Sequence, residues 1–330
     1  MIFYPAVLAL ISGSLLIVAI LLYANWYGIR ILRRWDIRSG SELQLGLERR
    51  TYLISTIMAY ALGFQLLSLF LFIYTADHLA SLFSGAMCAA GTLNVNRWGY
   101  PTLVLKIVNF TAAGIWLIVN STDNSAYDYP LIKKKYALLL PITASIAVEA
   151  VMQTSFFLWL KPDVITSCCG TLFTSATNEA SGIAALPWKP IAAAFYALTA
   201  ATLGSGFFFY LKGRGVYLFS LFNAGLFVVS IFALLAYISP YIYELPTHHC
   251  PFCILHREYN FVGYPIYLAL LAGGVSGLGT GAISPFSATE SLRETLPRIR
   301  KELTLVCLAS WLTALAISGW SSLTSHLRMG

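Results

Sequence analysis

The chain alternates long apolar segments with short polar ones. Each apolar segment has about the length that an α-helix needs to cross the ~30 Å hydrocarbon core of a bilayer, which is roughly 20 residues. There are eight of them, at residues 4–25, 52–75, 101–119, 137–160, 190–211, 216–239, 263–283 and 303–323. The pattern predicts an all-α, polytopic helical membrane protein with about eight transmembrane helices in contact with the lipid bilayer.

The composition agrees with this class. Of the 330 residues, 58% are hydrophobic and only 11% are charged, whereas a soluble domain carries about 25% charged residues. The net charge of +7 does not indicate nucleic-acid binding, because the basic residues gather in short segments where they set membrane orientation. The sequence contains no phosphate-binding loop, dinucleotide fingerprint or serine hydrolase elbow, so it predicts no nucleic-acid partner and no nucleotide chemistry.

Most basic residues lie between alternate pairs of apolar segments. Because cytoplasmic loops are enriched in lysine and arginine, we expect these loops in the cytoplasm. Both termini and the cysteine-containing loops are then expected on the periplasmic side of a bacterial inner membrane. The basic residues in question follow the first, third, fifth and seventh segments: Arg30, Arg33, Arg34, Arg38, Arg49, Arg50, Lys133, Lys134, Lys135, Lys212, Arg214, Arg293, Arg298, Arg300 and Lys301.

A short motif occurs twice at corresponding places. Asn96-Arg-Trp-Gly-Tyr-Pro101 leads into the third segment, and Asn260-Phe-Val-Gly-Tyr-Pro265 leads into the seventh. A cysteine precedes each copy, and an even number of membrane crossings separates the two. The motif therefore predicts two parallel four-helix repeats, residues 1–165 and 166–330. Proline suits the first turn of a helix, where its missing N–H is not needed.

All cysteines except one fall in loops expected on the outer side. The exception, Cys307, lies in the last apolar segment, where a small buried side chain is expected. Disulfides form and persist on the oxidising side of a membrane. The placement suits thiol–disulfide chemistry, and it suits capture of a soft metal ion equally well. The outer cysteines are Cys88, Cys168, Cys169, Cys250 and Cys253.

The central motif is Cys250-Pro-Phe-Cys253. Two intervening residues bring both sulfurs within bonding reach, so the pair can cycle between dithiol and disulfide. With Cys250 as the reactive thiol, Cys253 would resolve its mixed disulfides, and nearby histidines and Arg257 would lower the pKa of Cys250. Three alternatives stay open: a redox pair, a structural disulfide, or a soft-metal site that adds His248, His249 and His256.

The adjacent pair Cys168-Cys169 adds a second thiol centre. Neighbouring cysteines bond to each other only with strain, so they are better suited to act as a two-thiol clamp or to bond separately to other cysteines. One arrangement joins Cys88 to Cys168 or Cys169 and leaves the other free to exchange with Cys250 and Cys253. Sequence alone does not fix this connectivity.

Two ionisable side chains lie inside predicted helices. Glu149 is near the middle of the fourth, with Gln153 one turn on, and Lys106 is in the third, with Asn109 on nearly the same face. An unpaired charge at such depth is expensive, so both side chains are expected to face the bundle interior, where they can pair. Lys106 can instead extend its side chain outward to the membrane surface. Lys106, Glu149 and Gln153 are candidates for holding a quinone or substrate or for moving a proton. The alternative is a polar contact that joins helices.

The Cys250–Cys253 motif resembles the active-site pair of glutaredoxin-like enzymes. A CxxC pair at the outer mouth of a helical bundle also resembles membrane disulfide generators of the DsbB type and vitamin K epoxide reductases. That resemblance implies electron transfer between a periplasmic thioredoxin-like protein and a quinone. Cys250 and Cys253 would be the quinone-proximal pair, and Cys168, Cys169 or Cys88 the relay. The adjacent cysteines also resemble those of mercuric-ion transporters.

Three functions follow as hypotheses. The first is an inner-membrane thiol–disulfide oxidoreductase that exchanges electrons with a periplasmic partner and, as the resemblance above implies, with a quinone. The second is a transporter or permease component that binds a soft metal ion or a thiol compound. The third is a structural subunit of a larger membrane complex, with other membrane subunits as partners and disulfides that staple its loops.

Overall fold

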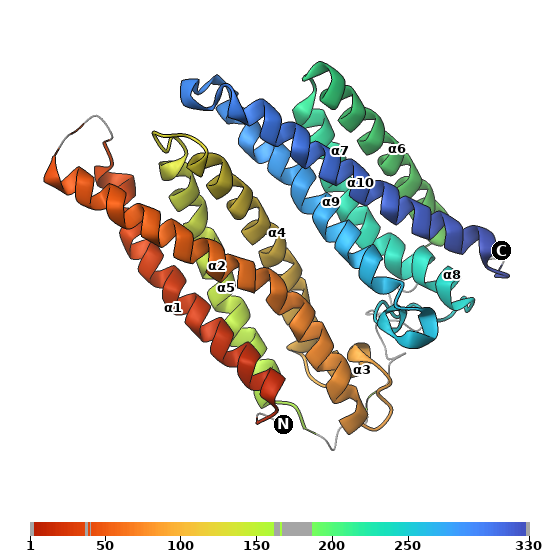
Figure 1. Ribbon diagram of the computed structural model, residues 1–330. Coiled ribbons are helices and arrows are strands. Elements are labelled where there is room, and N and C mark those ends of the chain that lie inside the picture. The colour runs from red at the N-terminus through yellow and green to blue at the C-terminus, as the bar shows by residue number, and fades with distance from the viewer. Residues whose placement is uncertain (1–2, 37–38, 40, 162–165, 167–186, 328–330) are drawn as a thin grey trace. The chain divides into compact units, whose positions relative to one another are not determined.

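The computed structural model describes residues 3–36, 39, 41–161, 166 and 187–327, and these residues are helical without strands. Within them, eight helical segments are long and apolar enough to cross a membrane (Figure 1). This confirms the all-α, eight-helix prediction. The segments are α1 (Pro5–Arg34), α2 (Glu42–Leu79), α4 (Gly99–Asn124), α5 (Ile132–Leu158), α6 (Trp188–Lys212), α7 (Val216–Ala233) continued by η3 (Leu234–Ile238) and α8 (Ser239–Tyr243), α9 (Gly263–Ile283) and α10 (Thr295–Thr324).

The helices carry apolar side chains outward and polar ones inward. Leu16, Val151 and Leu221 are each more than 60% exposed, whereas Lys106 and Glu149 are almost fully buried. A soluble protein has the opposite arrangement, because water solvates charged groups and repels apolar ones. Lipid reverses both preferences. The chain is therefore a multi-pass protein whose outer surface contacts the bilayer.

Several helices extend further than their apolar cores. Helix α1 ends at Arg34, whereas its apolar segment ends at residue 25. Helix α5, which contains the fourth apolar segment, begins at Ile132, whereas that segment begins at residue 137. Lysine and arginine are good helix formers, so the helices continue through them into the polar layer. Lys135 was expected in a polar loop. It lies instead in α5, where it is fully buried and its Nζ is 2.7 Å from Asp123 Oδ2.

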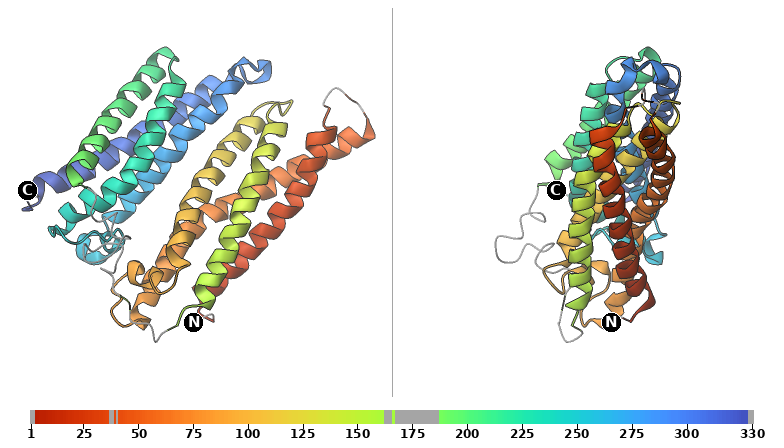
Figure 2. Two further views of the ribbon diagram at one scale, coloured as in Figure 1. Left: turned by 180° about the vertical axis from the view of Figure 1, so that it is seen from behind. Right: turned by 90° about the vertical axis from the view of Figure 1, so that its left-hand side faces the viewer.

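The described residues divide into two compact units. The first comprises Met1–Thr75, Asn96–Lys161 and Pro285–Ile299, and the second comprises Ala76–Val95, Pro162–Ser284 and Arg300–Gly330. In the first unit α5 packs against both α1 and α4, and in the second α7 packs against both α6 and α9 (Figure 2). The last turn of α2 and the short helix α3 (Ala89–Leu93) thus belong with the second unit.

Both copies of the repeated motif begin a helix. Pro101 is the third residue of α4 and Pro265 is the third residue of α9. The first N–H groups of a helix have no intrahelical acceptor, so a proline there sacrifices nothing. The helix starts are as the motif predicts. The relation of the two halves as parallel repeats stays a prediction.

The second unit depends on close contact between α7 and α9. A Cβ added to Gly277 would lie 2.3 Å from Cγ of Asn223, which is fully buried in α7. That amide donates to the Gly274 carbonyl at 3.0 Å and accepts from Trp311 Nε1 at 2.8 Å. Gly273, Gly277 and Gly281 of α9 are spaced four residues apart, a pattern that predicts a face which another helix can approach closely. A Cβ at each of them would meet a neighbouring side chain, so they form that packing face, and Asn223 joins α7, α9 and α10.

Replacing Gly277 by alanine should lower stability by about 1–3 kcal/mol, since the added methyl has no room and Asn223 has to move. The measurement is the thermal unfolding midpoint in detergent. Gly204→Ala is the matched control, because nothing lies within 4 Å of a Cβ at this position in α6. If both variants unfold at the same temperature, the close approach of α7 and α9 does not contribute to stability.

Candidate functional site

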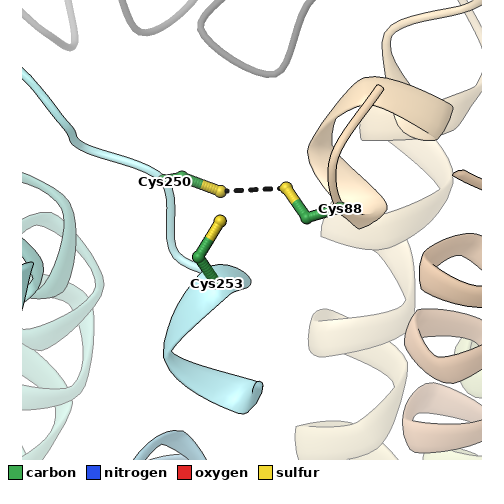
Figure 3. A group of neighbouring side chains, drawn as sticks. All are labelled: Cys88, Cys250 and Cys253. Atoms are coloured by element: carbon green, nitrogen blue, oxygen red, sulfur yellow. Dashed lines mark hydrogen bonds between the residues drawn. The ribbon is translucent and has the colours of Figure 1, made fainter. Parts of the chain in front are cut away.

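Three cysteines from two distant parts of the sequence meet in the second unit. Cys88 is the residue that precedes α3. Cys253 is the first residue of η4 (Cys253–Leu255), and Cys250 lies three residues before it. The Sγ atoms of Cys88 and Cys250 are 3.3 Å apart, and all three Sγ atoms lie within 4.8 Å of one another (Figure 3). The structure holds them as thiols, and no disulfide joins the cysteines it describes. We call these three residues the thiol cluster.

The Cys250–Cys253 loop is held in a fixed shape by its own backbone and by tyrosines. The N–H of His256 donates to the Cys253 carbonyl at 3.0 Å, which closes the η4 turn. The Tyr243 hydroxyl donates to the Cys250 carbonyl at 2.6 Å, and the Tyr267 hydroxyl donates to the Pro251 carbonyl. Backbone carbonyls are thereby satisfied by the two helices that flank the loop, so both sulfurs project from an anchored turn.

The glycine of the second repeated motif brings this turn against α9. A Cβ on Gly263 would lie 2.8 Å from Ile254 Cγ1 and 2.9 Å from the Ile254 carbonyl oxygen. Only glycine leaves room for that backbone contact. The motif thus positions the turn that begins with Cys253, in addition to starting a helix.

One carboxylate connects the two segments that supply the sulfurs. Asp77 Oδ1 accepts the N–H of Ala89 at 3.0 Å, directly after Cys88, and lies 3.0 Å from His256 Nε2. Asp77 belongs to the last turns of α2, and His256 follows Cys253 by three residues. The Asp77–His256 pair therefore fixes Cys88 relative to the Cys250–Cys253 loop.

The cluster polarises its own thiols. Hydrogen bonds from Cys253 and then Cys88 lower the pKa of Cys250 to about 4 against the opposing effect of burial, with help from the backbone N–H groups of Phe252 and Cys253. The pKa of Cys253 is raised, first because its proton is held in the hydrogen bond to Cys250. The sequence had suggested that Arg257 and the histidines lower the pKa of Cys250. In the structure the neighbouring thiols of Cys253 and Cys88 lower it, and they favour a thiolate at Cys250 between two hydrogen-bond donors.

The three cysteines differ in the exposure of the whole residue. Cys88 and Cys250 are buried, whereas Cys253 is partly exposed. Cys253 is therefore the most exposed member of the cluster. The sequence suggested Cys250 as the thiol that reacts with a partner, because the more N-terminal thiol of such a pair usually has the lowered pKa.

The three candidate histidines contact other groups. His256 pairs with Asp77, His249 Nδ1 lies 3.0 Å from the Leu235 carbonyl oxygen in the π-helical turn η3, and the His248 ring packs edge-on against Tyr243. Burial, and then the neighbouring His249, lower the pKa of His248. Among the described residues, the group whose ligand atoms converge contains the three cysteines alone. Cys168 and Cys169 lie outside the described residues, so their role as a relay stays a prediction.

In the first unit, Lys106 and Glu149 form the expected ion pair, with Nζ and Oε1 2.7 Å apart. Asn109 donates to the other carboxylate oxygen at 2.6 Å, and Gln65 donates to both oxygens. Gln153 takes no part and donates to the Leu10 carbonyl at 3.0 Å. The polar contacts join α2, α4 and α5, and Gln153 joins α5 to α1. Their mutual satisfaction favours the helix-joining alternative over a free handle for quinone or substrate.

Sequence reasoning missed Gln65, Asp123 and Asp77. Gln65 and Ser68 stand three residues apart inside an apolar segment, a spacing that places both on one helix face, and this signal was available. Asp77 gave weaker information, because an acidic residue at the end of a membrane helix is usually solvated. Its contacts come from residues 12 and 179 positions away.

Comparisons of the chain with protein-family models, with curated proteins and with solved structures found no match. The geometry of the thiol cluster and the chemistry of its residues are therefore the basis for inferring a function.

Replacing Glu149 by leucine should destabilise the protein by about 3–5 kcal/mol, because it leaves the Lys106 ammonium buried without its counter-charge. The double variant Lys106→Met/Glu149→Leu should recover most of that loss. Thermal unfolding of both single variants and the double variant, in one detergent, measures the coupling. A double variant as unstable as the sum of the singles would show that the pair is not coupled.

Replacing Asp77 by alanine should lower the effective concentration of Cys88 toward Cys250 at least tenfold, since both segments lose their shared acceptor. The readout is the Cys88–Cys250 disulfide formed in a glutathione redox buffer, in a Cys253→Ser background, by mass spectrometry after alkylation. Glu258→Gln, which removes an exposed carboxylate from the same loop, is the control. Equal disulfide yields in the two variants would show that Asp77 does not position Cys88.

Proposed function

We propose that this chain is a membrane thiol–disulfide exchange protein, with the thiol cluster as its reacting centre. The observation that carries the proposal is the convergence of three thiols within 4.8 Å. A disulfide has a sulfur–sulfur distance of about 2.05 Å, so a small side-chain rotation suffices to bond Cys250 to either neighbour. A structural staple needs only two cysteines. A third within reach provides a second disulfide partner and hence a route for exchange.

The reaction begins at the partly exposed thiol. Cys253 attacks the disulfide of an external partner and forms a mixed disulfide, and its proton passes to the partner sulfur that leaves. The Cys250 thiolate then attacks the Cys253 sulfur, releases the second partner sulfur as a thiolate and closes the Cys250–Cys253 disulfide. The two cysteines have then supplied two electrons and one proton, solvent supplies the second proton, and the partner disulfide has become two thiols. The reverse sequence oxidises the partner.

Cys88 extends this sequence by one step. Cys88 attacks the Cys250 sulfur of the Cys250–Cys253 disulfide and its proton passes to the departing Cys253 sulfur, so the bond moves to Cys88–Cys250 and Cys253 is released as a thiol. The 3.3 Å contact between the Cys88 and Cys250 sulfurs favours this transfer. Cys88 thus acts as the relay, one of the three positions that the sequence suggested for that role.

The proposal extends to the surroundings of the reaction. The distribution of lysine and arginine along the sequence supports a bacterial inner membrane with the cluster on the periplasmic face. A thioredoxin-like protein is the partner that the CxxC motif suggests. A quinone as the second redox partner is supported only by the resemblance, and the mutual satisfaction of Lys106 and Glu149 weighs against their binding one.

The test is disulfide trapping. In Cys250→Ser the resolving thiol is gone, so a mixed disulfide between Cys253 and a thioredoxin-like partner or glutathione should accumulate at least fivefold over wild type on non-reducing gels and by mass spectrometry. Cys253→Ser should accumulate far less, because Cys250 is buried. Cys307→Ser, a change in the interior of α10, is the control and should match wild type.

Two outcomes would contradict the proposal. If Cys253→Ser traps the partner and Cys250→Ser does not, the order of attack is reversed and the first step as written is wrong. If no variant traps a partner and the wild-type cysteines show no change between oxidising and reducing buffers, the cluster does not exchange disulfides. A loss of thermal stability without trapping would then indicate a structural role.

A further inference from the structure

We propose that Cys88, Cys250 and Cys253, when all three are reduced, bind one soft metal ion, with Cu(I) as the preferred ion. This inference does not depend on disulfide exchange. It needs three thiols at once, whereas exchange needs one pair oxidised. It also differs from the metal site suggested by the sequence, because Cys88 replaces the histidines.

The distances fit an ion among the three sulfurs. A metal–sulfur bond to such an ion is about 2.3 Å. Three sulfurs around one ion are then roughly 3.8 Å apart in a pyramidal arrangement and roughly 4.0 Å apart in a planar one, by simple geometry from that bond length. The observed contacts run from 3.3 Å between Cys88 and Cys250 to at most 4.8 Å within the group. Shifts below 1 Å are enough to equalise them.

The donor set selects the class of ion. All the converging ligand atoms in the described part of the chain are sulfurs, and thiolates favour soft ions over magnesium, calcium or manganese. His249 and His256 are directed to the Leu235 carbonyl and to Asp77, so neither adds a nitrogen. Structural zinc sites use four protein ligands. Within the part of the chain that the structure describes, three thiolates converge without a fourth donor, and such a set is better matched to Cu(I), a soft ion.

The surroundings suit capture from one side. Cys88 and Cys250 are buried and Cys253 is partly exposed, so an ion can enter past Cys253 and come to lie between ligands already in position. The Asp77–His256 pair and the Tyr243 hydroxyl hold both ligand segments before binding. Preorganisation of this kind lowers the cost of ordering ligands around the ion. On binding, the ion displaces the thiol protons, which pass to solvent.

The experiment titrates the full-length reduced protein in detergent, without oxygen, with Cu(I) in competition with a chromophoric Cu(I) chelator. We expect one equivalent to bind. Cys88→Ser, Cys250→Ser and Cys253→Ser should each weaken binding at least a hundredfold. Cys307→Ser and the double variant Cys168→Ser/Cys169→Ser should keep wild-type affinity, because the site needs neither helix-buried Cys307 nor the adjacent pair. A parallel Zn(II) titration should show weaker binding than Cu(I).

Oxidised wild-type protein provides a test without any substitution. Closing a disulfide within the cluster should abolish Cu(I) binding, and reduction should restore it, whatever the stability of the serine variants. Retention of binding in Cys88→Ser, loss of binding in Cys168→Ser/Cys169→Ser, or tighter binding of Zn(II) than of Cu(I) would overturn the proposal. A wild-type protein that binds no Cu(I) while Cys250→Ser still traps a partner would overturn it and leave disulfide exchange standing.

Discussion

A charged or strongly polar side chain inside a lipid-facing bundle has to find its partners within the protein. Both units of this chain are organised by that constraint. In the first, Glu149 collects donors from α2 and α4, and its ion pair with Lys106 joins these helices to α5. In the second, Asn223 collects partners from α9 and α10. Apolar surfaces in lipid gain little by packing together, so these polar contacts specify which helices are neighbours.

The same logic operates near the helix ends, where it builds the thiol cluster. Asp77 has two acceptor oxygens and satisfies a backbone N–H and an imidazole with them. Those two donors, Ala89 and His256, follow Asp77 by 12 and 179 positions in the sequence. One carboxylate therefore holds together the two distant segments that carry the sulfurs. The chemistry of the site therefore depends on a residue that itself carries no redox or metal-binding function.

Features governed by local pattern were predictable from the sequence. The apolar lengths gave the helices, the four-residue glycine spacing gave the α9 packing face, and the depth of Lys106 and Glu149 placed both side chains in the bundle interior, where they pair. What failed were properties that depend on distant partners. Lys135 was counted as a loop charge because it stands beside two other lysines. It is in fact in the first turn of α5, where it is buried and forms an ion pair with Asp123. The contact of Cys88 with Cys250 joins residues 162 positions apart, and no spacing rule indicates such a meeting.

The π-helical turn at Leu234–Ile238 has a consequence for how the cluster tolerates change in its own chain length. A residue added to a regular helix rotates everything after it by about 100°, and a π turn absorbs one such extra residue locally. The phase of the helix beyond this turn decides that Tyr243 faces the loop and donates to the Cys250 carbonyl. Removing a single residue here would leave the membrane span intact in length and hydropathy, yet turn Tyr243 away from the cysteine it supports. The angular register of one helix is thus part of the thiol site.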